Sequence, residues 1–165
     1  MHEDHSASRP KAPAAADHRV VHGRFGPVVA APENTVHMPQ GLLGFGAHRR
    51  FALGTLADPR FAQLRALQSL DDDDLAFLVL PLDPDAGLVG RDDLIEACRT
   101  LGMSLADTAI LLIVTVRRDA DGPHASANLR APVFVDTRAR IGVQYVLGDE
   151  RYPIRLPLTR GGRAA

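Results

Sequence analysis

Residues 127–147 contain two apolar runs separated by a short polar segment, and this pattern constrains the fold more than any other stretch. The runs are rich in β-branched residues. The segment between them reads Asp136-Thr137-Arg138-Ala139-Arg140, and Gly142 follows closely. This arrangement predicts two antiparallel strands joined by a turn, with the glycine assisting the reversal. We therefore expect a fold rich in β-structure.

The rest of the chain repeats this theme, with short apolar runs separated by turn residues. Such runs predict strands, and they cover residues 18–22, 27–31, 35–38, 51–56, 64–69, 75–80 and 109–116. Residues 91–101 instead place their apolar side chains at helical spacing and stop at Gly102, which predicts one helix. Many short strands with one short helix predict a mainly β fold, a small antiparallel β-barrel or sandwich-like single domain.

The length of 165 residues is enough for one domain with its own core. Residues 1–17 show no apolar periodicity and predict a disordered N-terminal arm, so the ordered β domain is expected over 18–158, with a flexible tail over 159–165. Cys98 is the single cysteine, which excludes an intramolecular disulfide and favours a reducing compartment. No signal peptide or run of membrane-spanning length is present, so we expect a cytoplasmic protein without membrane contact.

Charge is distributed unevenly along the chain. The net charge is −1, but residues 71–107 carry ten acidic and two basic side chains. A nucleic-acid-binding domain is usually basic, because phosphate contacts supply much of its affinity. The pattern therefore argues against direct nucleic-acid binding and favours a basic protein partner.

Asp71, Asp72, Asp73 and Asp74 form the densest part of this acidic region, between two predicted strands. At the tip of a hairpin such a run could meet a basic partner. Alternatively, aspartate simply favours turns and keeps a sheet edge soluble. In that case the acidic docking surface is expected among other carboxylates, which are Asp83, Asp85, Asp92, Asp93 and Glu96.

Residues that could support catalysis lack the required context. Cys98 lies on the apolar face of the predicted helix and is expected to be buried. No serine stands in a hydrolase elbow, and the histidines show no metal-binding spacing. Residues 41–46 are rich in glycine but precede a strand, which excludes a phosphate-binding loop. We expect no catalytic residue, metal or cofactor. Phe45 in this loop is expected to tuck inward, or else to be an exposed anchor for a partner.

Five motifs in order resemble the FliW family of flagellar assembly factors, from about Val20 to Leu158. They are Phe25-Gly26, the stretch from His37 to Phe45, the stretch from Leu67 to Phe77, Ala127-Asn128-Leu129 before Ala131-Pro132, and Tyr152-Pro153-Ile154-Arg155. Ala66 stands where the family tends to have an aromatic residue.

The resemblance implies a non-enzymatic regulator on a small antiparallel β-barrel or β-sandwich. It implies two partners, flagellin and the RNA-binding translational repressor CsrA, which is captured once flagellin has been exported. The expected partner-binding residues are Phe45, Asp71, Asp72, Asp73, Asp74 and Asn128. Asn128 could equally fix its own loop through its amide. A small-molecule-binding β-barrel, or an enzyme built on one, remains the alternative.

Overall fold

The structure is a computed structural model that describes residues 18–159 and 163–164. The predicted arm over 1–17 and part of the predicted tail, 160–162 and 165, lie outside the described residues. The described strands are β1 (Arg19–Gly23), β2 (Gly26–Ala30), β3 (Thr35–His37), β4 (Arg50–Thr55), β5 (Arg65–Ser69), β6 (Ala76–Leu82), β7 (Thr108–Asp119), β8 (Gly122–Ala127), β9 (Val133–Asp136), β10 (Ile141–Gln144) and β11 (Leu156–Pro157). The helices are α1 (Arg91–Thr100) and two 3-10 turns, η1 (Pro59–Phe61) and η2 (Leu105–Asp107).

Seven strands close into a ring, which confirms the predicted mainly β barrel. The ring runs β3-β4-β5-β6-β7-β9-β10 and closes through the pairing of β10 with β3. That closing pair is parallel, and the other pairs of the ring are antiparallel. Closure satisfies backbone groups that an open sheet would leave unpaired at its two edges.

Alternation along β7 separates the inside of the barrel from the outside. Leu111 packs with the interior cluster, which includes Phe51, Leu67 and Val133, each at most 3% exposed. Its neighbours Ile110 and Leu112 point the other way, into the cluster around α1. This period of two is what a strand buried on both faces requires. The barrel interior is therefore filled by side chains.

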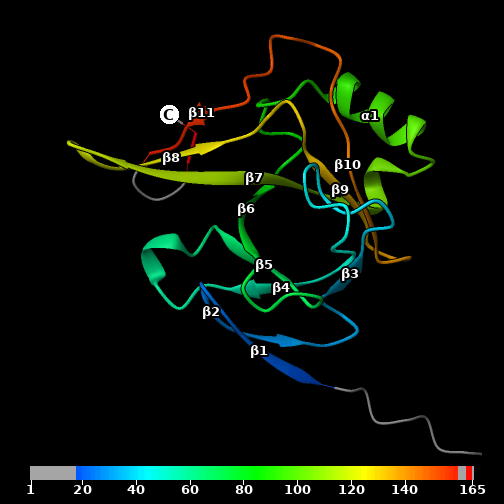
Figure 1. Ribbon diagram of the computed structural model, residues 1–165. Helices are drawn as coiled ribbons and strands as arrows, with labels where there is room; N and C mark the ends of the chain where they lie inside the picture. The colour runs from blue at the N-terminus through cyan, green and yellow to red at the C-terminus, as the bar shows by residue number, and fades with distance from the viewer. Residues whose placement is uncertain (1–17, 160–162, 165) are drawn as a thin grey trace, which may run out of the picture.

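The α1 helix covers one end of the molecule, and the β1–β2 hairpin lies at the other (Figure 1). Leu94, Ala97 and Cys98 bury one side of α1, which confirms the prediction for Cys98. The helix ends in a Schellman motif, in which the Met103 N–H donates to the Cys98 carbonyl. Gly102 provides the positive φ of 69° that this motif needs.

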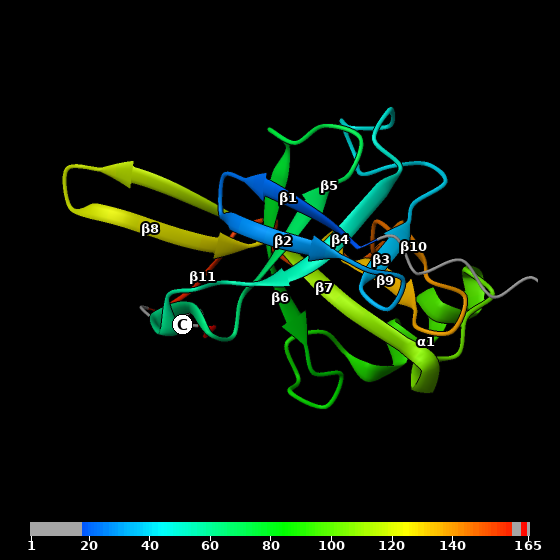
Figure 2. The same cartoon turned by 90° about the horizontal axis from the view of Figure 1, so that it is seen from below.

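The β1–β2 hairpin is a separate two-stranded sheet that packs across β4 and β5 (Figure 2). Val28 of β2 meets Ala52 and Ala66, and both alanines are fully buried. Gly54 lies directly below, because a Cβ added there would be 2.7 Å from Val28 Cγ2. Small residues on β4 and β5 thus allow the hairpin to approach closely, and Ala66 is a core position.

The hairpin predicted over 127–147 is present, but it is shorter than predicted and its turn is built differently. Strands β9 and β10 pair antiparallel, but residues 127–132 precede the hairpin. The predicted role of Gly142 in the turn is wrong, since Gly142 lies within β10. Arg140 provides the positive φ, 57°, and Asp136 Oδ1 accepts hydrogen bonds from the N–H groups of Arg138 and Ala139.

Two further segments differ from expectation. Strand β7 extends to Asp119, beyond the predicted end at Val116, and pairs there with β8 as a ribbon that projects from the barrel (Figure 2). Strand β8 was not predicted, because its sequence, Gly-Pro-His-Ala-Ser-Ala, has no apolar alternation. Its strand geometry comes from pairing with β7 on one side and β11 on the other.

Candidate functional site

The acidic run Asp71–Asp74 forms the turn between β5 and β6, as predicted. Its shape depends on Gln68, which is only 1% exposed. Gln68 Nε2 donates to the carbonyls of Ser69, Asp73 and Leu75 at 3.0–3.1 Å. The two N–H groups of this buried amide are shared among three carbonyls, one of which, that of Leu75, also accepts from the Ser69 N–H. The turn is thus held from below by one side chain.

Two more side chains complete this support. Ser69 Oγ accepts hydrogen bonds from the N–H groups of Asp71 and Asp72 at 3.1 Å. Asp71 Oδ2 accepts from the N–H groups of Arg49 and Arg50, at 2.8 and 3.0 Å, and Asp71 Oδ1 pairs with the Arg50 guanidinium. Burial raises the pKa of the Asp71 carboxyl, but these donors outweigh burial and hold the pKa below its ordinary value. Asp71 therefore fastens the turn to the start of β4.

The other three carboxylates are exposed and differ in their partners. Asp72 Oδ1 accepts a hydrogen bond from the Asp74 N–H, which closes a small local turn. Asp73 pairs with Arg19 at the start of β1, 2.7 Å away, and both side chains are more than half exposed. The carboxylate of Asp74 has no ion pair or hydrogen bond with the described residues. The turn therefore presents negative charge to solvent on a fixed backbone.

A second exposed feature is the loop from Gly41 to His48, between β3 and β4. Leu42 anchors it in the interior cluster at 3% exposure, whereas Leu43 is 58% and Phe45 38% exposed. Phe45 is not tucked fully inward; its ring packs edge-on against Phe77 of β6, with centroids 5.0 Å apart. Phe45 is therefore partly covered by the barrel and partly accessible to solvent.

The acidic turn and this loop are neighbours. Arg49 and Arg50 directly follow the loop and hold Asp71, while Phe77 follows the acidic turn by three residues and supports Phe45. The structure therefore brings together Phe45 and the four aspartates, which are separated by more than 20 residues in the sequence. We call Leu43, Phe45 and Asp71–Asp74 the acidic-apolar surface.

Asn128 occupies a turn of its own, between β8 and β9. Its Oδ1 accepts hydrogen bonds from the N–H groups of Arg130 and Ala131, at 3.0 and 3.1 Å. Gln144 of β10 connects this turn to the loop. Gln144 Nε2 donates to the Ala131 carbonyl, and Gln144 Oε1 accepts from the Leu43 N–H. Asn128 thus reaches the acidic-apolar surface through a chain of hydrogen bonds, as support and not as part of it.

The residues that position this surface without having been predicted to do so include Arg19, Gln68 and Gln144. Gln68 stands inside the Leu-Gln-Ser motif, and a polar residue at a buried alternation position of a predicted strand was the signal that could have identified it. Arg19 and Gln144 left no comparable signal, because each acts across the fold on a segment 50 or more residues away.

Other kinds of site find no support in the part of the chain that the structure describes. Within 18–159 and 163–164, no group of three or more His, Cys, Asp or Glu side chains is arranged to hold a metal ion. Burial raises the pKa of the Cys98 thiol, which disfavours the reactive thiolate, although a hydrogen bond with Thr108 acts in the opposite direction. None of the helices in the described residues is both long and apolar enough to cross a membrane.

Comparison with known proteins gives a consistent result. The family model described as FliW protein matches residues 19–158. The flagellar assembly factor FliW of Caldicellulosiruptor saccharolyticus is 31% identical over 134 residues, covering 79% of this chain and 84% of that protein. The flagellar assembly factor FliW of Geotalea uraniireducens is 32% identical over 139 residues, covering 84% and 83%.

A solved structure has the same fold. The crystal structure of a flagellar assembly factor FliW superimposes with a TM-score of 0.62 at 23% sequence identity, covering 87% of this chain and 96% of that one. The family match extends over β1 to the region of β11, so it includes every element that builds the acidic-apolar surface. This chain belongs to the FliW family of flagellar assembly factors.

Proposed function

We propose that this chain is a non-enzymatic, cytoplasmic regulator that binds flagellin and, in alternation, the RNA-binding translational repressor CsrA. By taking CsrA away from flagellin messenger RNA when flagellin is scarce, it would couple flagellin synthesis to export. Membership in a family of flagellar assembly factors is the observation that carries this proposal. The contact residues proposed are Phe45, Asp72, Asp73 and Asp74.

The acidic-apolar surface supports the proposal through its chemistry. Three exposed carboxylates on a fixed turn would attract a basic RNA-binding protein and accelerate its association. Because the turn is held by Gln68, Ser69 and Asp71, binding would cost little ordering of the backbone. Phe45 adds an aromatic side chain of the kind that dominates protein interfaces.

The alternative, a small-molecule-binding barrel, has less support. Buried side chains fill the barrel interior, among them Met38, Phe51 and Leu67, each at 0% exposure. A barrel that encloses a ligand needs an interior left open by small residues. We therefore place the function on the outer surface.

Size-exclusion chromatography with the cognate flagellin monomer tests the first partner. We expect a new, larger species at micromolar concentrations, and Phe45→Ser should weaken its formation by about tenfold, as loss of an aromatic anchor does. Val116→Ser, at an exposed apolar position on the β7–β8 ribbon, is the matched control and should leave binding unchanged. Two unshifted peaks from the wild-type mixture would contradict flagellin binding.

A further inference from the structure

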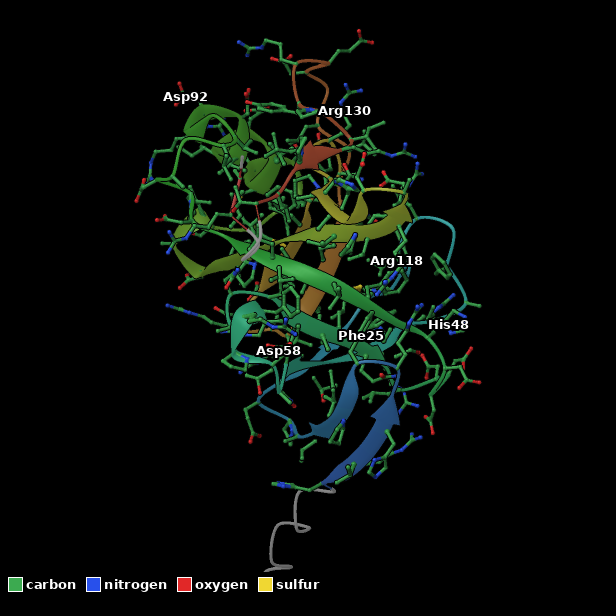
Figure 3. All side chains as sticks on the ribbon, turned by 90° about the vertical axis from the view of Figure 1, so that its left-hand side faces the viewer. Phe25, His48, Asp58, Asp92, Arg118 and Arg130 are labelled. Atoms are coloured by element: carbon green, nitrogen blue, oxygen red, sulfur yellow. The ribbon has the colours of Figure 1, made fainter. Side chains whose placement is uncertain are left out.

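A small cavity lies between α1 and the segment 145–152, which directly follows Gln144, the residue that accepts a hydrogen bond from the Gly41–His48 loop. Figure 3 shows Asp92 of α1 near one end of the molecule and His48 in the other half. The cavity has a volume of about 90 Å³ and is lined by eight residues: Asp93, Glu96, Ala97, Tyr145, Leu147, Gly148, Asp149 and Tyr152. This volume fits the headgroup of a side chain and is too small for a whole cofactor.

The lining combines aromatic rings with carboxylates and contains no basic side chain. Tyr145 and Tyr152 are the two tyrosines of the chain, and both line this cavity. Tyrosine rings and carboxylates both attract cations, the rings through their negative faces and the carboxylates through charge-assisted hydrogen bonds.

The polar groups of the cavity are held in place. Tyr152 is 8% exposed, and its hydroxyl donates to Asp93 Oδ2 while accepting from the Gly90 N–H at 2.9 Å. Burial raises the pKa of Tyr152, and the hydrogen bond to Asp93 raises it further, so the hydroxyl keeps the proton that it donates. The ring of Tyr145 packs edge-on against Phe134, with centroids 6.2 Å apart. The cavity walls are therefore preorganised.

The three carboxylates differ in how far they are already neutralised. Glu96 pairs with Arg99 at 2.7 Å, and Asp149 pairs with Arg151 at 2.5 Å. Asp93 makes no ion pair with a residue in the described ranges, although, after the hydrogen bond with Asp149, its charge contributes to the raised pKa of Arg151, and its Oδ1 accepts no hydrogen bond from these residues. Asp93 is thus a half-buried carboxylate in a cavity, beside two tyrosines, with one oxygen available.

We infer that this cavity binds a guanidinium or ammonium group, with Asp93 as its counter-ion and Tyr145 and Tyr152 as its walls. The group could belong to an arginine or lysine side chain of a protein partner or to a small free cation. This inference does not depend on the proposed function, because the cavity contains no residue of the acidic-apolar surface.

The chain offers a direct optical readout, since it has no tryptophan and its two tyrosines both line the cavity. Tyrosine fluorescence of the full chain therefore reports on this cavity alone. We expect a saturable change with ethylguanidinium chloride at millimolar concentration and fixed ionic strength, and none with N-ethylurea, its neutral analogue of similar shape. The peptide acetyl-Gly-Arg-Gly-amide, compared with ethylguanidinium, distinguishes the two sources: tighter binding of the peptide indicates a protein side chain, and equal or weaker binding indicates a free cation.

Variants make the test specific. Asp93→Asn keeps a side-chain oxygen for Tyr152 and should weaken binding of ethylguanidinium by about tenfold, as loss of a charge-assisted contact does. The control Asp73→Asn, on the acidic-apolar surface, should bind as the wild type does. Circular dichroism establishes that each variant is folded; if Asp93→Asn does not fold, Glu96→Gln replaces it, with weaker binding again expected. The inference is overturned if the wild type gives no saturable change, if N-ethylurea gives the same change, or if the folded cavity variant binds as tightly as the wild type.

Discussion

At the scale of single residues, the polar side chains of this protein mostly hold backbone in place. Gln68, Ser69 and Asn128 each make two or three hydrogen bonds to main-chain groups. Asp71 does the same with one carboxylate oxygen. The backbone geometry of these turns therefore depends on a few side-chain hydrogen bonds, and removing one of these side chains removes partners of main-chain groups.

Asn128→Ala removes the acceptor of the Arg130 and Ala131 N–H groups. We expect the free energy of unfolding to fall by about 1–2 kcal/mol, which corresponds to one or two ordinary hydrogen bonds. Thermal and urea denaturation measure this loss. Asn128→Asp keeps the acceptor and should be closer to wild type. An unchanged melting temperature together with abolished partner binding would instead make Asn128 a contact residue.

Asp71→Asn tests the lowered pKa of that carboxyl. A group whose pKa is lower in the folded state stabilises the fold above its unfolded pKa and loses this effect as the pH falls through the folded pKa. The variant should therefore be less stable than wild type at pH 7, and the difference should shrink below about pH 4. Denaturation across this range measures it, with Asp74→Asn as the matched control. A difference that stays constant with pH would contradict this role for Asp71.

At the scale of elements, the β1–β2 hairpin depends on small residues beneath it. Gly54→Ala would place a methyl group 2.7 Å from Val28 Cγ2, so the hairpin must shift. We expect a loss of about 1–3 kcal/mol in unfolding free energy, typical of overpacking. Val28→Ala makes room, so the double variant should lose less than the sum of the single losses. Additive losses in this double-mutant cycle would contradict the proposed contact.

A helix or turn could be predicted from the sequence where the residues of that segment alone determine its structure. The α1 helix ends at Thr100 within one residue of expectation, and the turn over Asp71–Asp74 joins β5 and β6 as expected. Gly142 was misassigned because a glycine near a turn also serves close packing; a Cβ there would be 3.0 Å from Val36 Cγ1. Strand β8 is a strand because it pairs with β7 and β11, and its own residues show no strand pattern that could have predicted it.

At the scale of the whole molecule, a barrel was among the predicted folds, but the strand pairs that close it could not be predicted. Ring closure depends on β10 meeting β3 and on β7 pairing with both β6 and β9, contacts between segments far apart in the sequence. The acidic-apolar surface arises differently: β4 pairs with β5 and β5 with β6, and these pairings bring the Gly41–His48 loop to the turn before β6. Phe45 and the aspartates could therefore be predicted as separate candidate residues, but not that they lie close together.

The proposed function is a switch between two partners, flagellin and CsrA. Release of RNA from CsrA tests this switch most directly. Fluorescence anisotropy of a labelled flagellin leader RNA bound to cognate CsrA follows the release. Adding this chain should lower the anisotropy to that of free RNA, and adding flagellin monomer should restore it. Asp73→Lys with Asp74→Lys should slow release and change its salt dependence, while Asp73→Asn with Asp74→Asn has a smaller effect. RNA that stays bound to CsrA at a micromolar excess of the wild-type chain would contradict the account.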